Sequence, residues 1–343
     1  ESMRSQLQKS LVRSHAAGSG PEVEREVIRA LNLLRISTLC TGRTGVRPEV
    51  AECYAKLLNA GITPIVHEFG SLGCSGDLAP LAHSALVLIG EGRARTKEGE
   101  EITGAEACSL AGFEPIELKE KEGLALINGT DGMLGQLCLA IDDIRRLVTT
   151  ADIATAMSVE GLNGTATVFT ADLQELRPHP GQAVAAANVT KLVEGSDILE
   201  AAAEEFAINQ VQDAYSVRCS PQVAGGVRDT LSHAIFVANN ELAAAVDNPV
   251  VAKDGRVTSN GNFHGAPVAY VLDFLAIVTA DLASVSERRT DRFLDPARNR
   301  GLNAFLADDP GVDSGHMIAQ YTQASIVSEM KRNAVPASVD SIP

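Results

Sequence analysis

Hydrophobic residues recur at helical spacing along most of the chain. Over residues 131–148 they fall three or four positions apart, which predicts a helix with one apolar face. That face consists of Leu134, Leu137, Ile141, Ile144 and Val148. The segment 267–287 opens with Pro267, is apolar on almost every side and ends in charged residues, so it predicts a helix in the middle of a bundle. Further helices are predicted over 22–41, 47–59, 78–89, 227–246 and 315–333.

Signals for β-strands are few and local. Val250-Val251 and Val257 flank Asp254-Gly255, a two-residue turn that accepts a positive φ at both positions, and a second small hairpin is expected at Glu98-Gly99. The pattern shows neither alternation of strands with helices nor an internal repeat. It therefore predicts a mainly α-helical protein and argues against a doubly wound parallel sheet.

The composition narrows the class of protein. With 343 residues, 45% of them hydrophobic, the chain can bury a large core. A net charge of −15 and a pI near 4.9 argue against nucleic-acid and anionic-membrane partners. The cysteines form no C-x-x-C pair, which signals neither zinc nor a disulfide framework and favours a reduced cytoplasmic protein. The longest apolar runs carry Asp, Ser or Gly too often to be expected to span a bilayer.

A glycine-rich loop at residues 70–77 precedes the apolar segment that begins at Leu78. Three glycines in seven residues permit backbone conformations that are closed to other residues. A tight loop in which Ser75 or Asp77 caps the next helix would explain this composition. A phosphate-binding loop is disfavoured, because the segment lacks both G-x-x-x-x-G-K-[ST] and a preceding strand.

The tripeptide Cys74-Ser75-Gly76 in this loop has a further chemical capability. If the loop is held bent, the Gly76 amide nitrogen can attack the Cys74 carbonyl and close a five-membered ring, because glycine has no side chain that obstructs the approach. Loss of two waters, one of them from Ser75, then leaves a methylidene group conjugated to the ring. The product would be a strong electrophile made without a bound metal or nucleotide.

The string GSLGCSGDLAPLAH at residues 70–83 resembles the signature of the aromatic amino-acid ammonia-lyases, the histidase family. Other segments resemble further motifs of this family in the same order, at 11–18, 126–130, 211–219, 260–264 and 337–343. Chance does not explain six motifs in family order. The resemblance implies a long-helix bundle of the ammonia-lyase (fumarase/aspartase-like) type, with an electrophile-bearing part at 1–130 and a central helical bundle at 131–343.

The resemblance also implies a prosthetic group and catalytic residues. In this family the tripeptide, here Cys74-Ser75-Gly76, becomes 4-methylideneimidazol-5-one without outside help. Asp77 would assist ring formation, and Arg218 would hold the substrate carboxylate through a bidentate fork. Tyr215 lies three residues before Arg218, on the same face of a helix, and the resemblance places it beside the electrophile for proton transfer. Without the motif, Arg218 would be an ordinary ion-pair residue and Tyr215 a packed tyrosine.

Further residues are implied in substrate binding. Asn128 and Gln212 resemble neutral hydrogen-bonding residues near the electrophile and the substrate carboxylate, and Phe263 resembles a wall of the pocket. Ser14-His15 is similar to the pair in histidine-specific members, and the His15 ring can hydrogen-bond an imidazole. Taken alone, Asn128 would mark a turn, Phe263 a core position and His15 a structural histidine.

The chain departs from the family pattern at several points. Cys74 stands where alanine is commonest, but the ring uses only its backbone carbonyl. Asp131 replaces the glutamine usual in histidine-specific members, which weakens the histidine assignment, and Ala214 replaces a common proline. The chain also begins after the family's upstream loop, whose Tyr is the β-proton base, and ends before a Gln-Glu-Asp-His segment. By itself it is therefore expected to fold but to be catalytically impaired.

The activity that the resemblance implies is conversion of L-histidine to trans-urocanate and ammonia. The family assembles each active site from several subunits, so a homotetramer is expected. One alternative is a phenylalanine or tyrosine ammonia-lyase, or the related aminomutase, which turnover of each amino acid would distinguish. Another is a non-catalytic core that serves assembly only, which the missing Tyr loop favours and which measured turnover would exclude.

Overall fold

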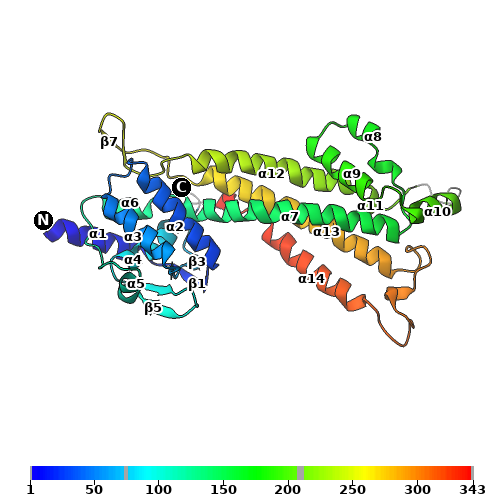
Figure 1. The fold of residues 1–343 in the computed structure, drawn as a ribbon, viewed down its shortest axis with the longest axis horizontal. Helices are drawn as coiled ribbons and strands as arrows, with labels where there is room; N and C mark the ends of the chain where they lie inside the picture. Colours follow the sequence, from blue (N-terminus) through cyan, green and yellow to red (C-terminus); the bar gives the residue numbers. More distant parts are fainter. Residues whose placement is uncertain (1, 73–75, 207–211, 341–343) are drawn as a thin grey trace. The chain divides into compact units, whose positions relative to one another are not determined.

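The computed structural model describes residues 2–72, 76–206 and 212–340. Most of these residues are helical, and the strands are short and form sheets of two or three strands (Figure 1). The long helices are α7 (Asp131–Gly161), α12 (Ser220–Leu242) and α13 (Ala266–Leu294). The prediction of a mainly α-helical fold built on long helices is confirmed.

The chain divides into two compact units that are assembled from separate stretches of sequence. Unit 1 comprises residues 1–140, 236–270 and 337–343, and unit 2 comprises residues 141–235 and 271–336. The helices α7, α12 and α13 each contribute residues to both units. The single division between residues 130 and 131 stays a prediction about how the family is organised.

Unit 1 packs short helices around one apolar core. Its helices are α1 (Ser2–His15), α2 (Arg25–Cys40), α3 (Pro48–Asn59), α4 (Leu78–Leu88), α5 (Gly104–Leu110), α6 (Glu122–Ile127) and η3 (Ser338–Asp340). Fully buried side chains of this core include Leu31, Tyr54, Leu57, Leu81, Leu88 and Leu126. Burial of apolar surface is the main stabilising contribution here. The core thereby fixes the start of α4, which follows the 70–77 loop, and the end of α6, which is followed by Asn128-Gly129.

Small antiparallel sheets complete unit 1. β1 (Ser19–Glu22) pairs with β3 (His67–Phe69), β4 (Arg93–Arg95) lies between β2 (Thr63–Pro64) and β5 (Glu101–Thr103), and β6 (Val250–Val251) pairs with β7 (Val257–Thr258). The hairpins predicted at 98–99 and 254–255 are confirmed. The β1–β3 pair was not predicted, because its strands are far apart in sequence and no local turn signal links them.

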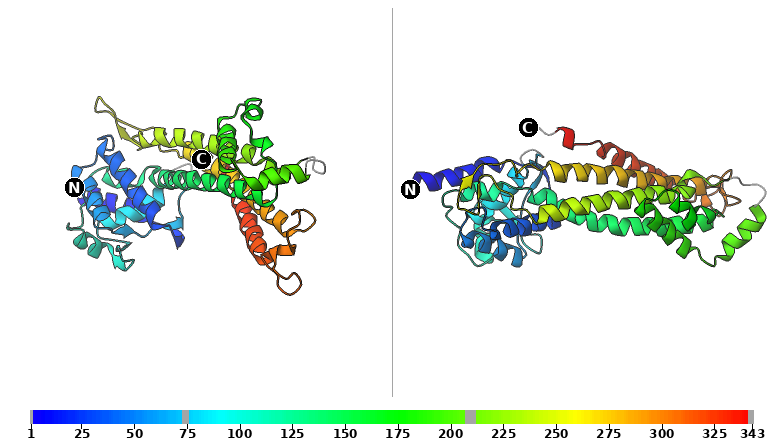
Figure 2. Two further views of the ribbon diagram at one scale, coloured as in Figure 1. Left: turned by 45° about the vertical axis from the view of Figure 1, so that its right-hand side comes forward. Right: turned by 90° about the horizontal axis from the view of Figure 1, so that it is seen from above.

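Unit 2 combines parts of the long helices with shorter ones. Within it, α7, α12 and α13 lie side by side (Figures 1 and 2). The shorter helices are η1 (Thr167–Phe169), α8 (Ala171–Glu175), α9 (Pro180–Leu192), α10 (Asp197–Phe206), α11 (Tyr215–Arg218), η2 (Ala304–Leu306) and α14 (Met317–Asn333). A second apolar cluster contains Val159, Phe169, Val189 and Val217. Val217 thus anchors α11, the single turn that carries Tyr215 and Arg218.

The predicted helices are largely confirmed. The five residues of the apolar face predicted over 131–148 are all buried in α7. The observed α2, α3, α4 and α14 begin and end within a few residues of the predictions, whereas α7 continues to Gly161 and α12 already begins at Ser220. The expectation that α13 lies in the middle of a bundle is wrong for the single chain, because Tyr270, Phe274 and Ile277 are 50%, 46% and 43% exposed.

Two helical stretches are long and apolar enough, by composition, to cross a membrane: Glu122–Gly161 and Ala266–Leu294. The expectation that polar residues are too frequent in every apolar run is therefore wrong, by length and composition, for these two stretches. In the first stretch 72% of the apolar window is buried, as in the core helix of a globular protein, and in the second 28% is buried. The apolar surface of α13 is of the kind that another helix or subunit covers.

Candidate active site

Gly76 is the one residue of the predicted tripeptide that the structure describes, since Cys74 and Ser75 lie outside the described residues. Its φ is +62°, and a Cβ at this position would lie 2.1 Å from the Gly129 carbonyl oxygen. Glycine is the residue that combines such a φ with so close an approach. The Leu72 N–H donates to the Gly76 carbonyl oxygen over 3.3 Å. The two described ends of the loop are therefore held together, as ring closure requires.

Asp77 ties this loop to the start of α7. Its Oδ2 accepts hydrogen bonds from the backbone N–H groups of Gly132 (2.7 Å) and Met133 (2.9 Å), and its Oδ1 accepts from the Ser71 hydroxyl (2.8 Å). Asp77 occupies the N-cap position of α4 without a side-chain capping bond, so the alternative in which its side chain caps the next helix is wrong, and Ser75 lies outside the described residues. The carboxylate instead satisfies free amides at the N-terminus of α7.

The pKa of the Asp77 carboxyl group is raised above its ordinary value. Burial raises its pKa to about 6, against the opposing effect of the hydrogen bonds from Met133 and Ser71. A carboxyl group with this pKa exchanges a proton close to neutral pH, as a general acid or base must.

Asn128 follows α6 and lies next to the same loop. Its Nδ2 donates to the Asn248 carbonyl oxygen (2.8 Å), and its own carbonyl oxygen accepts from Arg35 Nη1 (2.9 Å). The carbonyl oxygen of the next residue, Gly129, accepts from the Asp77 N–H (2.8 Å). Asn128-Gly129 is therefore a fixed connection between α6 and Gly76 rather than a free surface turn.

Phe263 approaches Gly76 with its backbone. The Phe263 carbonyl oxygen would lie 3.3 Å from a Cβ on Gly76, and the Phe263 side chain is half-buried. The segment that carries it is held by Asn248, whose Oδ1 accepts from the Asn260 N–H (2.9 Å). Since Asn128 binds the carbonyl of the same Asn248, one residue links two of the predicted substrate-binding segments.

His15 is the last residue of α1. Its Nδ1 lies 2.8 Å from the Leu11 carbonyl oxygen and 3.1 Å from Ser14 Oγ, so these two contacts engage Nδ1 and not Nε2. The following turn packs against the start of the 70–77 loop, because a Cβ on Gly18 would lie 3.2 Å from the Phe69 carbonyl oxygen. The structure therefore brings the His15 motif to the electrophile loop within unit 1.

The other predicted residues lie in unit 2, on α11 and just before it. The Arg218 guanidinium stacks over the Tyr215 ring at 4.6 Å from its centroid, which confirms that the two share a face. Arg218 Nε also donates to the Asp213 carbonyl oxygen (2.9 Å). The Tyr215 side chain is 73% exposed. These two residues are positioned by each other and by the adjacent backbone, at the surface of the single chain.

Asp213 anchors the segment before α11. It is buried, its Oδ1 accepts from Arg300 Nη2 (3.0 Å) and its Oδ2 accepts from the Thr165 N–H (2.8 Å). Gln212, Arg218 and Arg300 line a cavity of about 730 Å³ within unit 2. Guanidinium groups in a cavity wall suit a carboxylate. Sequence reasoning missed Arg300 and the anchoring role of Asp213, although Asp213 lies inside the motif at 211–219.

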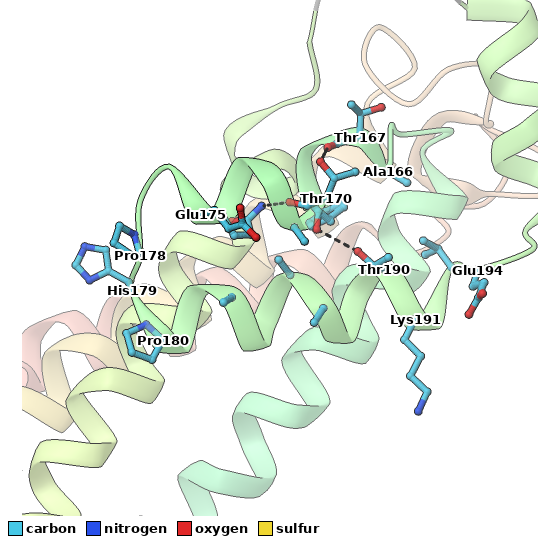
Figure 3. A pocket seen from close by; sticks show the side chains of 17 residues that line it. Ala166, Thr167, Thr170, Glu175, Pro178, His179, Pro180, Thr190, Lys191 and Glu194 are labelled. Atoms are coloured by element: carbon cyan, nitrogen blue, oxygen red, sulfur yellow. Dashed lines mark hydrogen bonds between the residues drawn. The ribbon is translucent and has the colours of Figure 1, made fainter.

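A cavity of about 990 Å³ elsewhere in unit 2 contains none of the predicted site residues (Figure 3). Residues of η1, α8 and α9 line it, and the hydroxyl of Thr190 donates to the Phe169 carbonyl oxygen (3.1 Å). Cavity size alone therefore does not identify the site. Among the described residues, no three His, Cys, Asp or Glu side chains gather as a metal site would require.

Comparison with known proteins agrees with this chemistry. The chain matches the family model "Aromatic amino acid lyase" over residues 1–343. It is 63% identical to histidine ammonia-lyase of Streptomyces griseus, a match that covers 99% of this chain and 66% of the relative. Among solved structures, histidine ammonia-lyase of Trypanosoma cruzi aligns with a TM-score of 0.89 and 39% identity, over 99% of this chain and 63% of that one. Phenylalanine aminomutase of Pantoea agglomerans aligns with a TM-score of 0.93 and 36% identity, over 99% and 68%.

These matches extend over the whole of the present chain, which spans about two thirds of the length of its curated relatives. The family resemblance predicted from six motifs is confirmed. The chain belongs to the aromatic amino acid lyase family.

Proposed function

We propose that the protein eliminates ammonia from L-histidine without oxidation and releases trans-urocanate. The observation that carries this proposal is the contact between Gly76 and the Gly129 carbonyl, with Asp77 hydrogen-bonded beside it. These residues fit a loop that is held bent for cyclisation. Histidine as substrate is supported by Ser14-His15 and by the 63% identity to a relative named histidine ammonia-lyase.

The prosthetic group would be 4-methylideneimidazol-5-one, formed from Cys74-Ser75-Gly76 without a metal or nucleotide. Once formed, it supplies an electrophile that captures the substrate amine and improves it as a leaving group. Gly76 would hold the group through the backbone, Asp77 would hold or move a proton during ring formation, and Asn128 would hydrogen-bond beside it. Phe263 would wall the pocket.

The remaining residues would bind the substrate and move its protons. Arg218 would hold the carboxylate through two parallel hydrogen bonds, with Gln212 as a further donor. His15 would recognise the imidazole through Nε2. The Tyr215 hydroxyl would assist proton transfer, a contribution of typically about 10²–10⁴-fold to the rate.

We further propose a cytoplasmic homotetramer in which subunits share active sites. The exposure of Tyr215 supports this, since a proton-transfer group works in a water-excluded site. The partly exposed apolar side chains of α13 are a second support. Free thiols at Cys40, Cys53, Cys108, Cys138 and Cys219 are consistent with a reducing compartment. The net charge of −15 disfavours nucleic acid and anionic membrane as partners.

Two alternatives to histidine ammonia-lyase activity are each favoured by a specific observation. A phenylalanine or tyrosine ammonia-lyase, or an aminomutase, is supported by the TM-score of 0.93 to phenylalanine aminomutase and by Asp131 in place of glutamine. A non-catalytic core that serves assembly is the alternative if Tyr215 stays exposed in the assembled protein, because its hydroxyl would then have no water-excluded site for proton transfer.

The test is turnover of L-histidine, L-phenylalanine and L-tyrosine by the purified protein, with separate detection of ammonia, the unsaturated acid and the β-amino acid. We expect urocanate and ammonia in equal amounts from histidine, and much slower reaction of the other two. Faster reaction of phenylalanine or tyrosine would contradict the histidine assignment, and β-amino acid product would indicate an aminomutase. Folded protein that turns over none of them would support the assembly role.

A further inference from the structure

Arg35 on α2 is a fully buried cation next to the electrophile loop. Its Nη1 donates to the carbonyl oxygens of Asn128 (2.9 Å) and Ala125 (3.3 Å), and its Nη2 donates to that of Val246 (3.2 Å). The last carbonyls of a helix have no partners within the helix, so the guanidinium caps the C-terminus of α6. Through Val246 it also holds the segment that leads to Asn248, the residue that binds the Asn128 side chain.

Asp131, the first residue of α7, is the counter-ion of Arg35. It is 4% exposed, and its Oδ2 lies 3.5 Å from Arg35 Nη2. Within the described part of the chain this Oδ2 accepts no hydrogen bond. The pair is thus an ion pair by distance, held in place by packing and by the carbonyls around Arg35.

Gly129 lies between this ion pair and the loop. A Cβ on Gly129 would lie 2.3 Å from Asp131 Oδ2 and 3.0 Å from Arg35 Nη1. Its carbonyl oxygen faces the other way and accepts the Asp77 N–H, at the point where it also meets Gly76. A displacement of Arg35 or Asp131 would therefore move Gly129, and with it the carbonyl oxygen that contacts Gly76.

The contacts distinguish this pair from other buried pairs in the chain. Asp152 on α7, for instance, pairs with Arg228 at 2.5 Å and binds Asn188, all within the helical part of unit 2. The hydrogen bonds of Arg35 end instead on segments that carry Asn128 and Asn248. A buried ion pair adds little net stability compared with apolar residues, and such a pair can instead fix the geometry of the segments that it joins.

We propose that Arg35 and Asp131 are positioning residues that fix Asn128-Gly129, and through its contact Gly76, in the geometry from which the Gly76 nitrogen can close the ring, an inference that rests on the proposed function. In that step the Gly76 nitrogen forms a bond to the Cys74 carbonyl carbon. The carbonyl oxygen leaves as one water with the N–H protons of Gly76 and Ser75. The Ser75 hydroxyl leaves as the second water with the Ser75 Cα proton. No oxidant or reductant takes part.

The experiment follows ring formation over time in the newly synthesised full chain. Trypsin releases residues 57–93, which contain the tripeptide, by cleaving after Lys56 and Arg93. The mass of this peptide at intervals after cell-free synthesis gives the fraction that has lost two waters. The variants are Arg35→Lys, which keeps the charge but cannot serve all the carbonyls, and the neutral double variant Arg35→Gln/Asp131→Asn. Asp152→Asn is the matched control. It breaks the buried pair with Arg228, which, among the described residues, shares no hydrogen-bond partner with Arg35 or Asp131.

We expect ring formation in both Arg35 variants to be slower by about 10²-fold, the usual order for a reacting geometry displaced by about 1 Å. The Asp152→Asn control should lose thermal stability but cyclise at the wild-type rate. Folded Arg35 variants that cyclise at the wild-type rate would overturn the proposal and leave the proposed function intact. Loss of helical circular dichroism in both Arg35 variants would also overturn it, because the pair would then be needed for folding itself. Absence of cyclisation in the wild type would overturn the proposed function and this inference with it.

Discussion

The surroundings of Gly76 in unit 1 and of Tyr215 in unit 2 differ in how completely one chain builds them. Asp77 is 2% exposed, and its carboxylate is bound by Ser71, Gly132 and Met133. Tyr215 is 73% exposed and contacts Arg218 by ring stacking. The fold of a single chain therefore holds Gly76, Asp77 and Gly129 in place, whereas the Tyr215 side chain stays exposed.

The two regions therefore differ in the source of their preorganisation: one chain can fix the geometry for ring formation, whereas exclusion of water for proton transfer needs a further surface. The proposed ring formation is an intramolecular reaction, so residues that one unit fixes by itself can provide the geometry that the step needs. Proton transfer to a bound substrate works in a site that excludes water. The proposed tetramer would supply that exclusion, and the exposed apolar side chains of α13 offer a surface for it.

The largest expected effect comes from Gly76→Ala. The new Cβ would lie 2.1 Å from the Gly129 carbonyl oxygen, and the residue would keep a φ of +62°. We expect ring formation and turnover to be abolished, as measured by the mass of the peptide 57–93. Gly99→Ala is the control, since its φ is +90° but its Cβ would meet nothing within 4 Å. Cyclised Gly76→Ala protein would contradict the view that this contact bends the loop.

The next largest effect is expected from Tyr215→Phe. This change removes the hydroxyl but keeps the ring under the Arg218 guanidinium. We expect kcat to fall by about 10²–10⁴-fold, the usual contribution of proton transfer by a positioned side chain. The peptide mass should show unaltered cyclisation. A variant with wild-type kcat would remove Tyr215 from the chemistry.

A smaller effect is expected from Arg218→Lys, which replaces the two-pronged guanidinium with a single ammonium group. Loss of a charge-assisted hydrogen bond is worth about 1.5–3 kcal/mol, so KM for histidine should rise by roughly 10- to 100-fold. Cyclisation should be unaffected. Arg146→Lys, at an exposed ion pair with Asp142, is the control and should leave KM unchanged. An unchanged KM in Arg218→Lys would show that another group binds the carboxylate.

The smallest effect concerns the pH dependence of stability through Asp77. Burial raises its pKa from 3.8 to about 6, so folding favours the protonated carboxyl. Its contribution to the free energy of unfolding is complete below the pKa of the unfolded state and is lost as the pH rises through about 6. Denaturant unfolding of wild type and Asp77→Asn should show their difference falling by about 2–3 kcal/mol from pH 4 to pH 7. A difference that stays constant or rises with pH would contradict the buried, raised-pKa carboxyl.

The sequence predicted those features that depend on residues close together in the chain. The apolar face of α7 follows from its spacing, and both hairpins follow from turn residues that lie between their strands. The stacking of Tyr215 with Arg218 follows from a separation of one helical turn. The family motifs added His15, Asn128 and Phe263, which lie on segments that the structure brings to the 70–77 loop.

The sequence did not predict features that depend on tertiary contacts. A side-chain cap of α4 by Asp77 was one of the alternatives, but the carboxylate binds amides of α7 that are more than fifty residues away. Arg35 gave no signal, because its partner Asn128 is 93 residues later and each lies in an ordinary local pattern. The exposure of α13 was missed because apolar periodicity shows which face is hydrophobic, not which chain covers it.

The mass of the peptide 57–93 from the wild-type protein shows directly whether unit 1 supports ring closure. If the contacts among Gly76, Asp77 and Gly129 are sufficient to close the ring, the mass will be lower than that of the unmodified sequence by two waters. The unmodified mass in folded protein would contradict the account, because the contacts among Gly76, Asp77 and Gly129 would then not be sufficient to close the ring.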